Sequence, residues 1–195
     1  MNVRIGSAPA AWGVCMPDDA KQPPWRQFLD EVGQAGYEWI ELGPYGYLPT
    51  DLPTLKTEIA GRGLKLSGGF VMRHFEDVGE WPLIEKELTA VGTIMASFGS
   101  RYLMLIDDTY TDVATGESLR SDQLSDDQWR TLIETTHKVA DLAKERFGLK
   151  LVFHPHAETH VEYEDQIEAF LEQTDPERVF LCLDTGHHSY RGGDA

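Results

Sequence analysis

The sequence contains little cysteine, no long apolar run and no recognisable export signal. Its 195 residues include two cysteines, Cys15 and Cys182, which are too few and too far apart for a disulfide framework and indicate reduced thiols in a cytoplasmic protein. No apolar run approaches the roughly 20 residues needed to span a bilayer, so we expect no membrane partner. The N-terminus lacks the basic and apolar regions of a secretory signal.

Basic residues are also scarce. The chain has 17 Lys and Arg against 33 Asp and Glu, a formal net charge of −16, which would repel a phosphate backbone. No Gly-x-Gly-x-x-Gly follows the first expected strand and no Gly-x-x-x-x-Gly-Lys-Ser/Thr occurs anywhere, so nucleotide binding loses its main support. We therefore expect no nucleic-acid partner, and a metal-dependent endonuclease is disfavoured.

Strand and helix patterns alternate along the whole chain. Strands are expected at residues 3–8, 39–43, 64–70, 102–106, 150–153 and 179–183, and helices at residues 25–35, 52–62, 81–98, 126–147 and 163–173. Such alternation requires parallel strands with right-handed crossovers, in an open doubly wound sheet or a (β/α) barrel. The polar segment at residues 109–125 is either a mobile surface excursion or, as we favour, an active-site loop.

Polar residues follow four of these strands, which favours the barrel, because barrel enzymes assemble their sites at the carboxyl ends of strands. They include Glu41, the Asp107-Asp108 pair, His154 and Asp184. We predict an α/β fold, a (β/α) TIM-type barrel forming one partial domain over residues 1–195. Six of the eight strand–helix units would be present, since a complete barrel takes about 250 residues.

Five of the seven histidines lie between Leu149 and His188, around the ends of the last two expected strands. The first run ends in His154-Pro-His156 and the second in Asp184-Thr-Gly-His187. Neutral imidazole and carboxylate suit zinc, manganese, cobalt or iron. Because neighbouring parallel strands end on one rim, these residues predict a metal or catalytic site there.

These motifs resemble the xylose-isomerase-like barrel superfamily of sugar isomerases and epimerases, and within it the inosose dehydratase group, which removes water from a keto-inositol. The resemblance covers essentially the whole chain in order. It rests on His154-Pro-His156 with Thr159, Thr174 to Pro176, Leu183 to His187, Gly192 to Asp194, Trp12-Gly13 and Ala35 to Gly43.

The resemblance implies one divalent metal, manganese or cobalt, with His154 where many members have a glutamate ligand and Asp184 matching an aspartate ligand. His187 matches a histidine that contacts substrate. Because histidine replaces glutamate, whether His154, His156 or both bind the metal stays open. The expected ligands from strands seven and eight are absent from these residues.

The implied chemistry is proton abstraction beside the carbonyl of a small polyol or sugar, leading to dehydration of a keto-inositol or to isomerisation or epimerisation of a ketose. Glu41 and His156 are the candidates for proton transfer, and His187 for orienting a hydroxyl. Trp12 would form an apolar wall for the substrate. A structural ion pair is the alternative for Glu41, and a core position is the alternative for Trp12.

A rival interpretation is a non-catalytic, truncated barrel fragment. A barrel with six strands leaves the first and last strands without neighbours, and such edges promote pairing with another chain. The chain would then form a homo-oligomer through its open strand edges.

Overall fold

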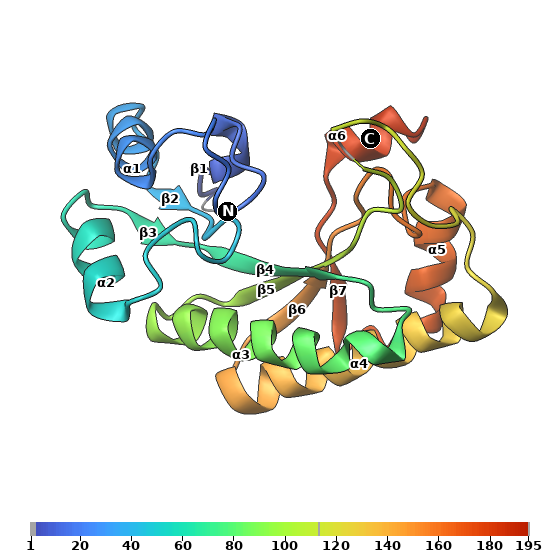
Figure 1. Cartoon of the computed structure of the whole chain (residues 1–195). Coiled ribbons are helices and arrows are strands. Elements are labelled where there is room, and N and C mark those ends of the chain that lie inside the picture. Colours follow the sequence, from blue (N-terminus) through green and yellow to red (C-terminus); the bar gives the residue numbers. More distant parts are fainter. Residues whose placement is uncertain (1–2, 113, 195) are drawn as a thin grey trace.

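The structure is a computed structural model that describes residues 3–112 and 114–194 (Figure 1). All strand pairs in this part of the chain are parallel, in the orders β1-β2-β3 and β4-β5-β6-β7. The strands are β1 (Gly6–Ser7), β2 (Trp39–Ile40), β3 (Lys65–Leu66), β4 (Gly68–Arg73), β5 (Tyr102–Asp107), β6 (Lys150–Phe153) and β7 (Val179–Leu181). The helices are α1 (Trp25–Gln34), α2 (Leu52–Ala60), α3 (Trp81–Ser97), α4 (Asp126–Phe147), α5 (Glu164–Gln173) and α6 (Thr185–Tyr190), with 3-10 helices η1 (Pro9–Trp12) and η2 (Val78–Glu80).

The expected third strand is divided into β3 and β4, which corrects the expected count of six strands to seven in the described residues. Both the backbone nitrogen and the hydroxyl of Ser67 donate to the Ile40 carbonyl, at 2.8 and 2.9 Å. The Gly68 carbonyl still accepts from Leu42 at 2.9 Å, but the strand pairing changes here, because β3 pairs with β2 whereas β4 pairs with β5. The space just after the division is tight, since a Cβ on Gly69 would lie 3.0 Å from Val91 Cγ1. All six barrel positions are thus occupied, the third by a bent strand.

Several boundaries differ from expectation: the strands expected at 39–43 and 179–183 are shorter, as β2 and β7, and the helix expected at 52–62 ends at Ala60. The first strand is shorter than residues 3–8, because only Gly6 and Ser7 pair with β2. Helix α6, which was not expected, follows β7 directly and begins after Asp184, whose side chain caps it.

Large apolar side chains fill the space between the strands and the long helices α3 and α4, which run side by side across β4 to β7 (Figure 1). On α3, Ile84, Leu88 and Val91 recur at helical spacing and are fully buried. Burying each such side chain contributes about 1.5–3 kcal/mol. Helix α4 begins with a capping box formed by Ser125 and Gln128, so both its start and its buried face are encoded locally.

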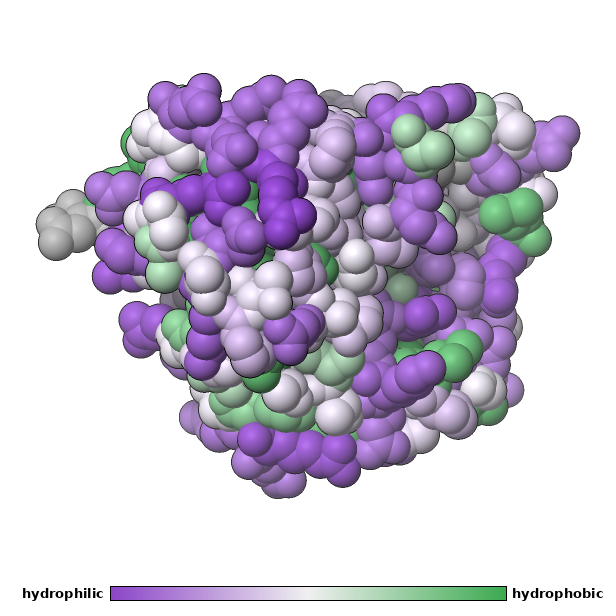
Figure 2. Space-filling model, turned by 60° about the vertical axis from the view of Figure 1, so that its left-hand side comes forward, coloured by the Kyte–Doolittle hydropathy of each residue, from purple (hydrophilic) through white to green (hydrophobic). Residues whose placement is uncertain are grey.

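The two outer strands each have one neighbour among the described residues, β2 for β1 and β6 for β7. Apolar side chains beside them are exposed: Val3 is 80% accessible, Ile5 70% and Leu183 48%. On the face in Figure 2, hydrophilic residues predominate and hydrophobic ones form small groups. No described helix is both long and apolar enough to cross a membrane. The arrangement is a partial barrel with two open edges.

Candidate metal centre

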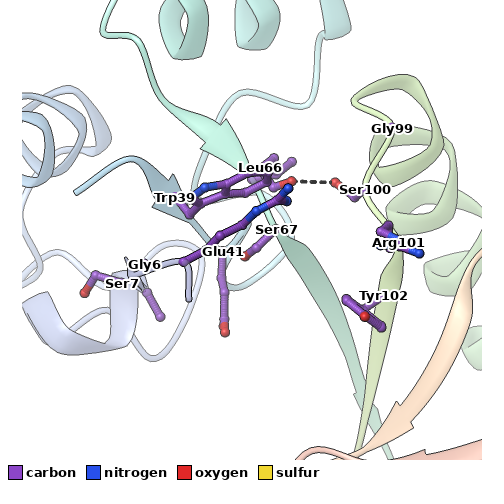
Figure 3. A pocket seen from close by; sticks show the side chains of 12 residues that line it. Gly6, Ser7, Trp39, Glu41, Leu66, Ser67, Gly99, Ser100, Arg101 and Tyr102 are labelled. Carbon is purple, nitrogen blue, oxygen red and sulfur yellow. Dashed lines mark hydrogen bonds between the residues drawn. The ribbon is translucent and has the colours of Figure 1, made fainter. Parts of the chain in front are cut away.

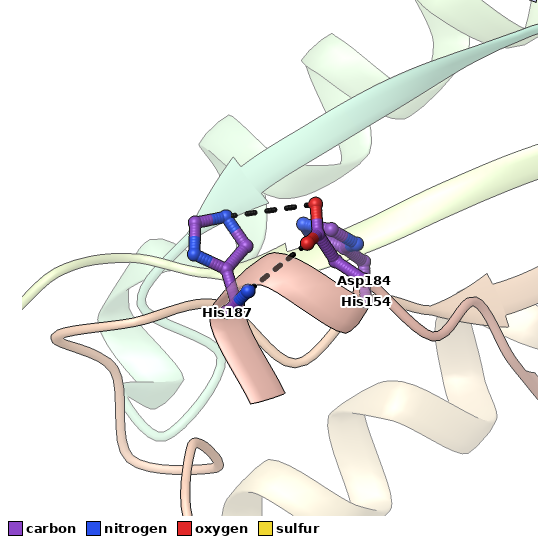
Figure 4. Close-up of side chains that lie close together, drawn as sticks. All are labelled: His154, Asp184 and His187. Carbon is purple, nitrogen blue, oxygen red and sulfur yellow. Dashed lines mark hydrogen bonds and ion pairs between the residues drawn. The ribbon is translucent and has the colours of Figure 1, made fainter. Parts of the chain in front are cut away.

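His154, Asp184 and His187 come together at the carboxyl ends of β6 and β7 (Figure 4). One imidazole nitrogen from each histidine and one carboxylate oxygen lie within 4.8 Å of one another. The His154 and His187 ring centroids are 5.5 Å apart, and His187 Nε2 lies 3.9 Å from Asp184 Oδ2. Two imidazoles and a carboxylate at this separation can converge on one divalent ion.

Asp184 is the N-cap of helix α6, and the hydrogen bonds of the cap fix its side chain. Its Oδ1 accepts hydrogen bonds from the backbone nitrogens of Gly186 at 2.7 Å and His187 at 3.0 Å, as an N-cap does. The other oxygen faces His187 Nε2. One carboxylate therefore starts the helix and contributes to the cluster, and the helix brings His187 back over the strand ends.

The protonation states of the cluster suit a metal. Burial, with the neighbouring His156 and His187, lowers the pKa of His154 to about 4, and burial and His156 also lower the pKa of His187. Burial acts to raise the pKa of Asp184, but the backbone donor of His187 and the neighbouring imidazoles outweigh it and the pKa is lowered. At neutral pH both imidazoles keep a lone pair and the carboxylate is anionic, so these residues fit a divalent metal.

His156 lies beside this cluster, with its ring centroid 4.0 Å from that of His187 and 5.8 Å from that of His154. Its Nδ1 lies 2.7 Å from the Ala157 carbonyl, so this nitrogen carries the proton and Nε2 is left for other partners. The choice between His154 and His156 now has a geometric basis, since His154 joins the group whose donor atoms lie within 4.8 Å.

Glu41 follows β2 and lines a cavity of about 510 Å³ between β1, β2 and β3 on one side and the start of β5 on the other (Figure 3). Burial, followed by the charge of Asp184, raises the pKa of the Glu41 carboxyl. The three residues of the metal cluster do not line this cavity. Glu41 links the two regions, because it lines the cavity and its pKa is also raised by the charge of Asp184 in the metal cluster.

Trp12 lies against helix α1. Its indole nitrogen donates to Glu31 at 2.8 Å, and its ring meets Phe28 edge-on with centroids 5.1 Å apart. These contacts fit the core alternative for Trp12, which is half-buried, and its contact with substrate stays a prediction.

The segment after β6 is tied to α6 by an ion-pair network that the sequence did not reveal. Arg191, at the end of α6, donates to Glu158 at 2.6 Å and also to Glu162. Tyr110, from the long segment after β5, donates to Glu162 at 2.6 Å. Glu158 has a positive φ of 65°, which is uncommon outside glycine. The network holds α6, and with it His187, against the strand ends.

A second cluster, also missed, lies on the same rim. Glu76, Asp107 and His160 are buried, and one donor atom of each lies within 4.8 Å of the others. Asp107 ends β5, a position that the sequence marked as polar. The long segment after β5 contacts this cluster, because the Ser121 carbonyl lies 3.1 Å from His160 Nε2. The preferred active-site role of residues 109–125 stays a prediction.

Comparison with known proteins relates this architecture to one family. A family model described as xylose isomerase-like TIM barrel matches residues 29–195. Inosose dehydratase of Clostridium perfringens is 29% identical over 198 residues, an alignment that takes in 100% of this chain and 65% of that protein. This chain thus spans about two thirds of the length of the curated relative it matches.

Solved structures show the same fold at low identity. A structure titled IOLI protein with a binding zinc atom aligns with a TM-score of 0.71 at 17% identity, over 98% of this chain and 66% of that one. D-psicose 3-epimerase with D-tagatose, from Clostridium cellulolyticum, aligns with a TM-score of 0.71 at 16% identity, over 99% of this chain and 67% of that one.

Proposed function

We propose that this chain, which belongs to the xylose isomerase-like TIM barrel family, carries part or all of the site of a metal-dependent enzyme that dehydrates a keto-inositol. The observation that carries the proposal is the convergence of His154, Asp184 and His187, with the half-buried carboxyl of Glu41 near enough for burial and the charge of Asp184 to raise its pKa. The reaction class is proton abstraction beside a carbonyl. Isomerisation or epimerisation of a ketose would share its first step.

His154 and Asp184 would hold the metal, with His187 as a third donor or as a contact to the substrate. Manganese or cobalt suits this set of nitrogen and oxygen donors. Bound there, a divalent ion would polarise the substrate carbonyl and stabilise the negative charge that develops on its oxygen.

Glu41 is the proposed base. A half-buried carboxylate with a raised pKa binds a proton more strongly than one in water. Its position after β2 puts it on a different strand from His154 and Asp184, so a substrate between them would meet the base and the metal ligands from different sides.

His156 is the second proposed proton carrier. Its Nδ1 is engaged with the Ala157 carbonyl, which leaves Nε2 to exchange a proton with a substrate hydroxyl. The ring of His187, 4.0 Å away between centroids, would orient that hydroxyl. Departure of a hydroxyl distinguishes dehydration from isomerisation, and the relative named inosose dehydratase supports dehydration.

The test is product formation from a keto-inositol by the purified chain with manganese, followed by mass spectrometry. The expected product has lost one water, and Glu41→Gln should lower the rate by at least about 100-fold. Glu38→Gln is the matched control, because the Glu38 side chain is 73% exposed and pairs only loosely with Lys65, at 3.8 Å. A product of unchanged mass would indicate isomerisation or epimerisation, and a chain that binds no manganese would overturn the proposal.

The second candidate is a non-catalytic fragment that self-associates. It is favoured by the exposed apolar side chains beside β1 and β7, including Val3, Ile5 and Leu183. Light scattering at rising concentration tests it. Association that is abolished by Ile5→Lys, in a chain that binds no metal, would support this candidate, and a metal-loaded monomer would exclude it.

A further inference from the structure

We infer that His160 is held as an imidazolium by Asp107, and that this pair positions the loop that carries His154 and His156. Asp107 and His160 are then positioning residues of the candidate site. The positioning role rests on the proposed function, whereas the charge state of His160 stands independently of it.

The charge follows from the partners of the two ring nitrogens. His160 Nδ1 lies 2.7 Å from Asp107 Oδ2, and His160 Nε2 lies 3.1 Å from the carbonyl oxygen of Ser121. Both partners are oxygens that accept hydrogen bonds, and a neutral imidazole can donate from only one nitrogen. Asp107 Oδ2 also accepts from the backbone nitrogen of His160 at 3.2 Å, which favours the ionised carboxylate. Both ring nitrogens therefore carry a proton.

The surroundings support this charge. Glu76 is 5% accessible and its carboxylate lies in the same cluster. It also pairs with His74, at 3.4 Å, and with Arg120, at 3.7 Å. Farther from the ring, Asp108 lies 3.8 Å from His74 Nε2, and the Tyr110 ring packs 5.8 Å from that of His160 between centroids. Two buried carboxylates thus face the imidazolium, with Arg120 as a second cation and the His74 ring beside Glu76.

The direction of the pKa shift of His160 agrees with the geometry, whereas burial of Asp107 acts against its charge. Burial acts to lower the pKa of His160, but the hydrogen bond to Asp107 and the charges of Asp107 and Glu76 outweigh it and the pKa is raised. Burial also raises the pKa of Asp107. A histidine whose pKa is raised on folding stabilises the fold fully below its unfolded pKa, and this contribution is lost as the pH rises through the folded value. The pair therefore retains its proton through neutral pH.

The donor atoms of Glu76, Asp107 and His160 lie close enough together to hold a metal. Both ring nitrogens of His160, however, already have hydrogen-bond partners. His160 has no lone pair left when both nitrogens donate. A metal would have to displace either Asp107 or the Ser121 carbonyl, and in doing so it would break the link that His160 makes between two segments. The hydrogen-bond pattern favours the protonated pair.

The link to the site runs along the segment after β6. Through His160, this segment is joined to the end of β5 at Asp107 and to the long segment after β5 at Ser121. Thr159, next to His160, donates to the carbonyl of His156 at 2.7 Å. Anchoring His160 therefore anchors the backbone of His156, which is two residues from His154. Loss of the imidazolium would loosen both rings.

Nitrogen-15 spectra of the histidine rings at pH 7 test the charge without any mutation. His160 should show two protonated nitrogens. His137 is an internal control of the opposite kind, because its Nε2 accepts from the backbone nitrogen of Asp175 at 2.9 Å and its pKa is lowered by burial. It should show one unprotonated nitrogen. An unprotonated nitrogen on His160 at pH 7 would overturn the inference.

Asp107→Asn tests the positioning role, with His160→Gln as the second variant if the first does not fold. The expected results are a manganese affinity about tenfold weaker, in the range typical of outer-shell changes, and shifted ring signals for His154 and His156. Asp141→Asn is the matched control, since the Asp141 side chain is 46% exposed and pairs with Arg178. Unchanged affinity and unchanged ring signals would overturn the role. If the parent chain binds no manganese, the proposed function fails while the ring signals still decide the inference.

Discussion

Two clusters of imidazole and carboxylate lie near the carboxyl ends of the strands, and they differ in burial and in hydrogen-bond partners. In the cluster of His154, Asp184 and His187, the side chains of Asp184 and His187 are 40% and 31% exposed. In the other, the side chains of His160 and Asp107 are 2% and 0% exposed. The same residue types are thus placed once at an accessible rim and once in the interior.

The partners of the imidazoles decide what each cluster can do. Burial, together with the neighbouring imidazoles of His156 and His187, lowers the pKa of His154 and leaves a lone pair for a metal. His160 faces a carboxylate and a carbonyl, which take up both of its donors. One nitrogen of each ring lies at a backbone carbonyl, that of Cys182 for His154 at 3.3 Å and that of Ser121 for His160 at 3.1 Å. The other nitrogen separates the two cases, because in His160 it lies 2.7 Å from a carboxylate oxygen, whereas in His154 it stays available to a metal under the proposed function.

The largest expected effect is on stability. His160→Ala should lower the free energy of unfolding by about 3–5 kcal/mol, because it leaves Asp107 as a buried charge without its partner. His187→Ala, at a partly exposed position, should cost less than about 1 kcal/mol. Urea denaturation of both variants makes the measurement. If both variants lost the same free energy of unfolding, the two clusters would not differ in their contribution to stability.

The next effect is on metal affinity. Asp184→Asn should weaken manganese or cobalt binding by at least about 100-fold, because it removes the anionic ligand, and asparagine remains a good N-cap for α6. Titration calorimetry measures the affinity, and circular dichroism checks that the helix survives. Binding by this variant as tight as in the parent would place any metal elsewhere in the chain.

Acid should have a smaller effect on manganese affinity, and this effect should arise in the accessible cluster of His154, Asp184 and His187. Since the pKa of His154 is about 4 and that of His187 is lowered, both rings are neutral above the ordinary histidine value, and protons compete with a metal only below it. We expect manganese affinity to be constant from about pH 8 to pH 7 and then to weaken by up to about tenfold per pH unit as each ring is protonated. Titrations at several pH values measure this. Weakening that begins above pH 7 would contradict the lowered pKa values.

The fold was largely predictable, because each strand and helix carries its own periodicity and cap signals. The division of the third strand was not, since it depends on the hydrogen bonds of Ser67 to Ile40, which is 27 residues away. Helix α6 had a local signal that could have revealed it. Asp184 precedes Thr-Gly-His, and its carboxylate can accept hydrogen bonds from the backbone nitrogens that follow, which is the pattern of an N-cap.

The accessible cluster was predictable because neighbouring parallel strands end on one rim, which brings the residues after β6 and β7 together. The buried pair was not, since Asp107 and His160 are 53 residues apart and His160 reaches Asp107 only through the path of an irregular segment. The same limit applies to Arg191 and Glu158, which are 33 residues apart. Contacts between loops leave no periodicity in a sequence.

The smallest expected effect separates two adjacent histidines. His187 contributes a nitrogen to the accessible cluster, whereas the ring of His188 lies over Gly193, where an added Cβ would be 2.2 Å from His188 Nε2. His188→Ala should therefore change manganese affinity by less than about threefold, while His187→Ala should weaken it by more than about tenfold, as expected when a nitrogen donor is lost. Calorimetry on the two variants, prepared in parallel, is the measurement. A larger loss in the His188 variant would mean that α6 presents the other histidine to the metal, and the assignment of the third donor would move to His188.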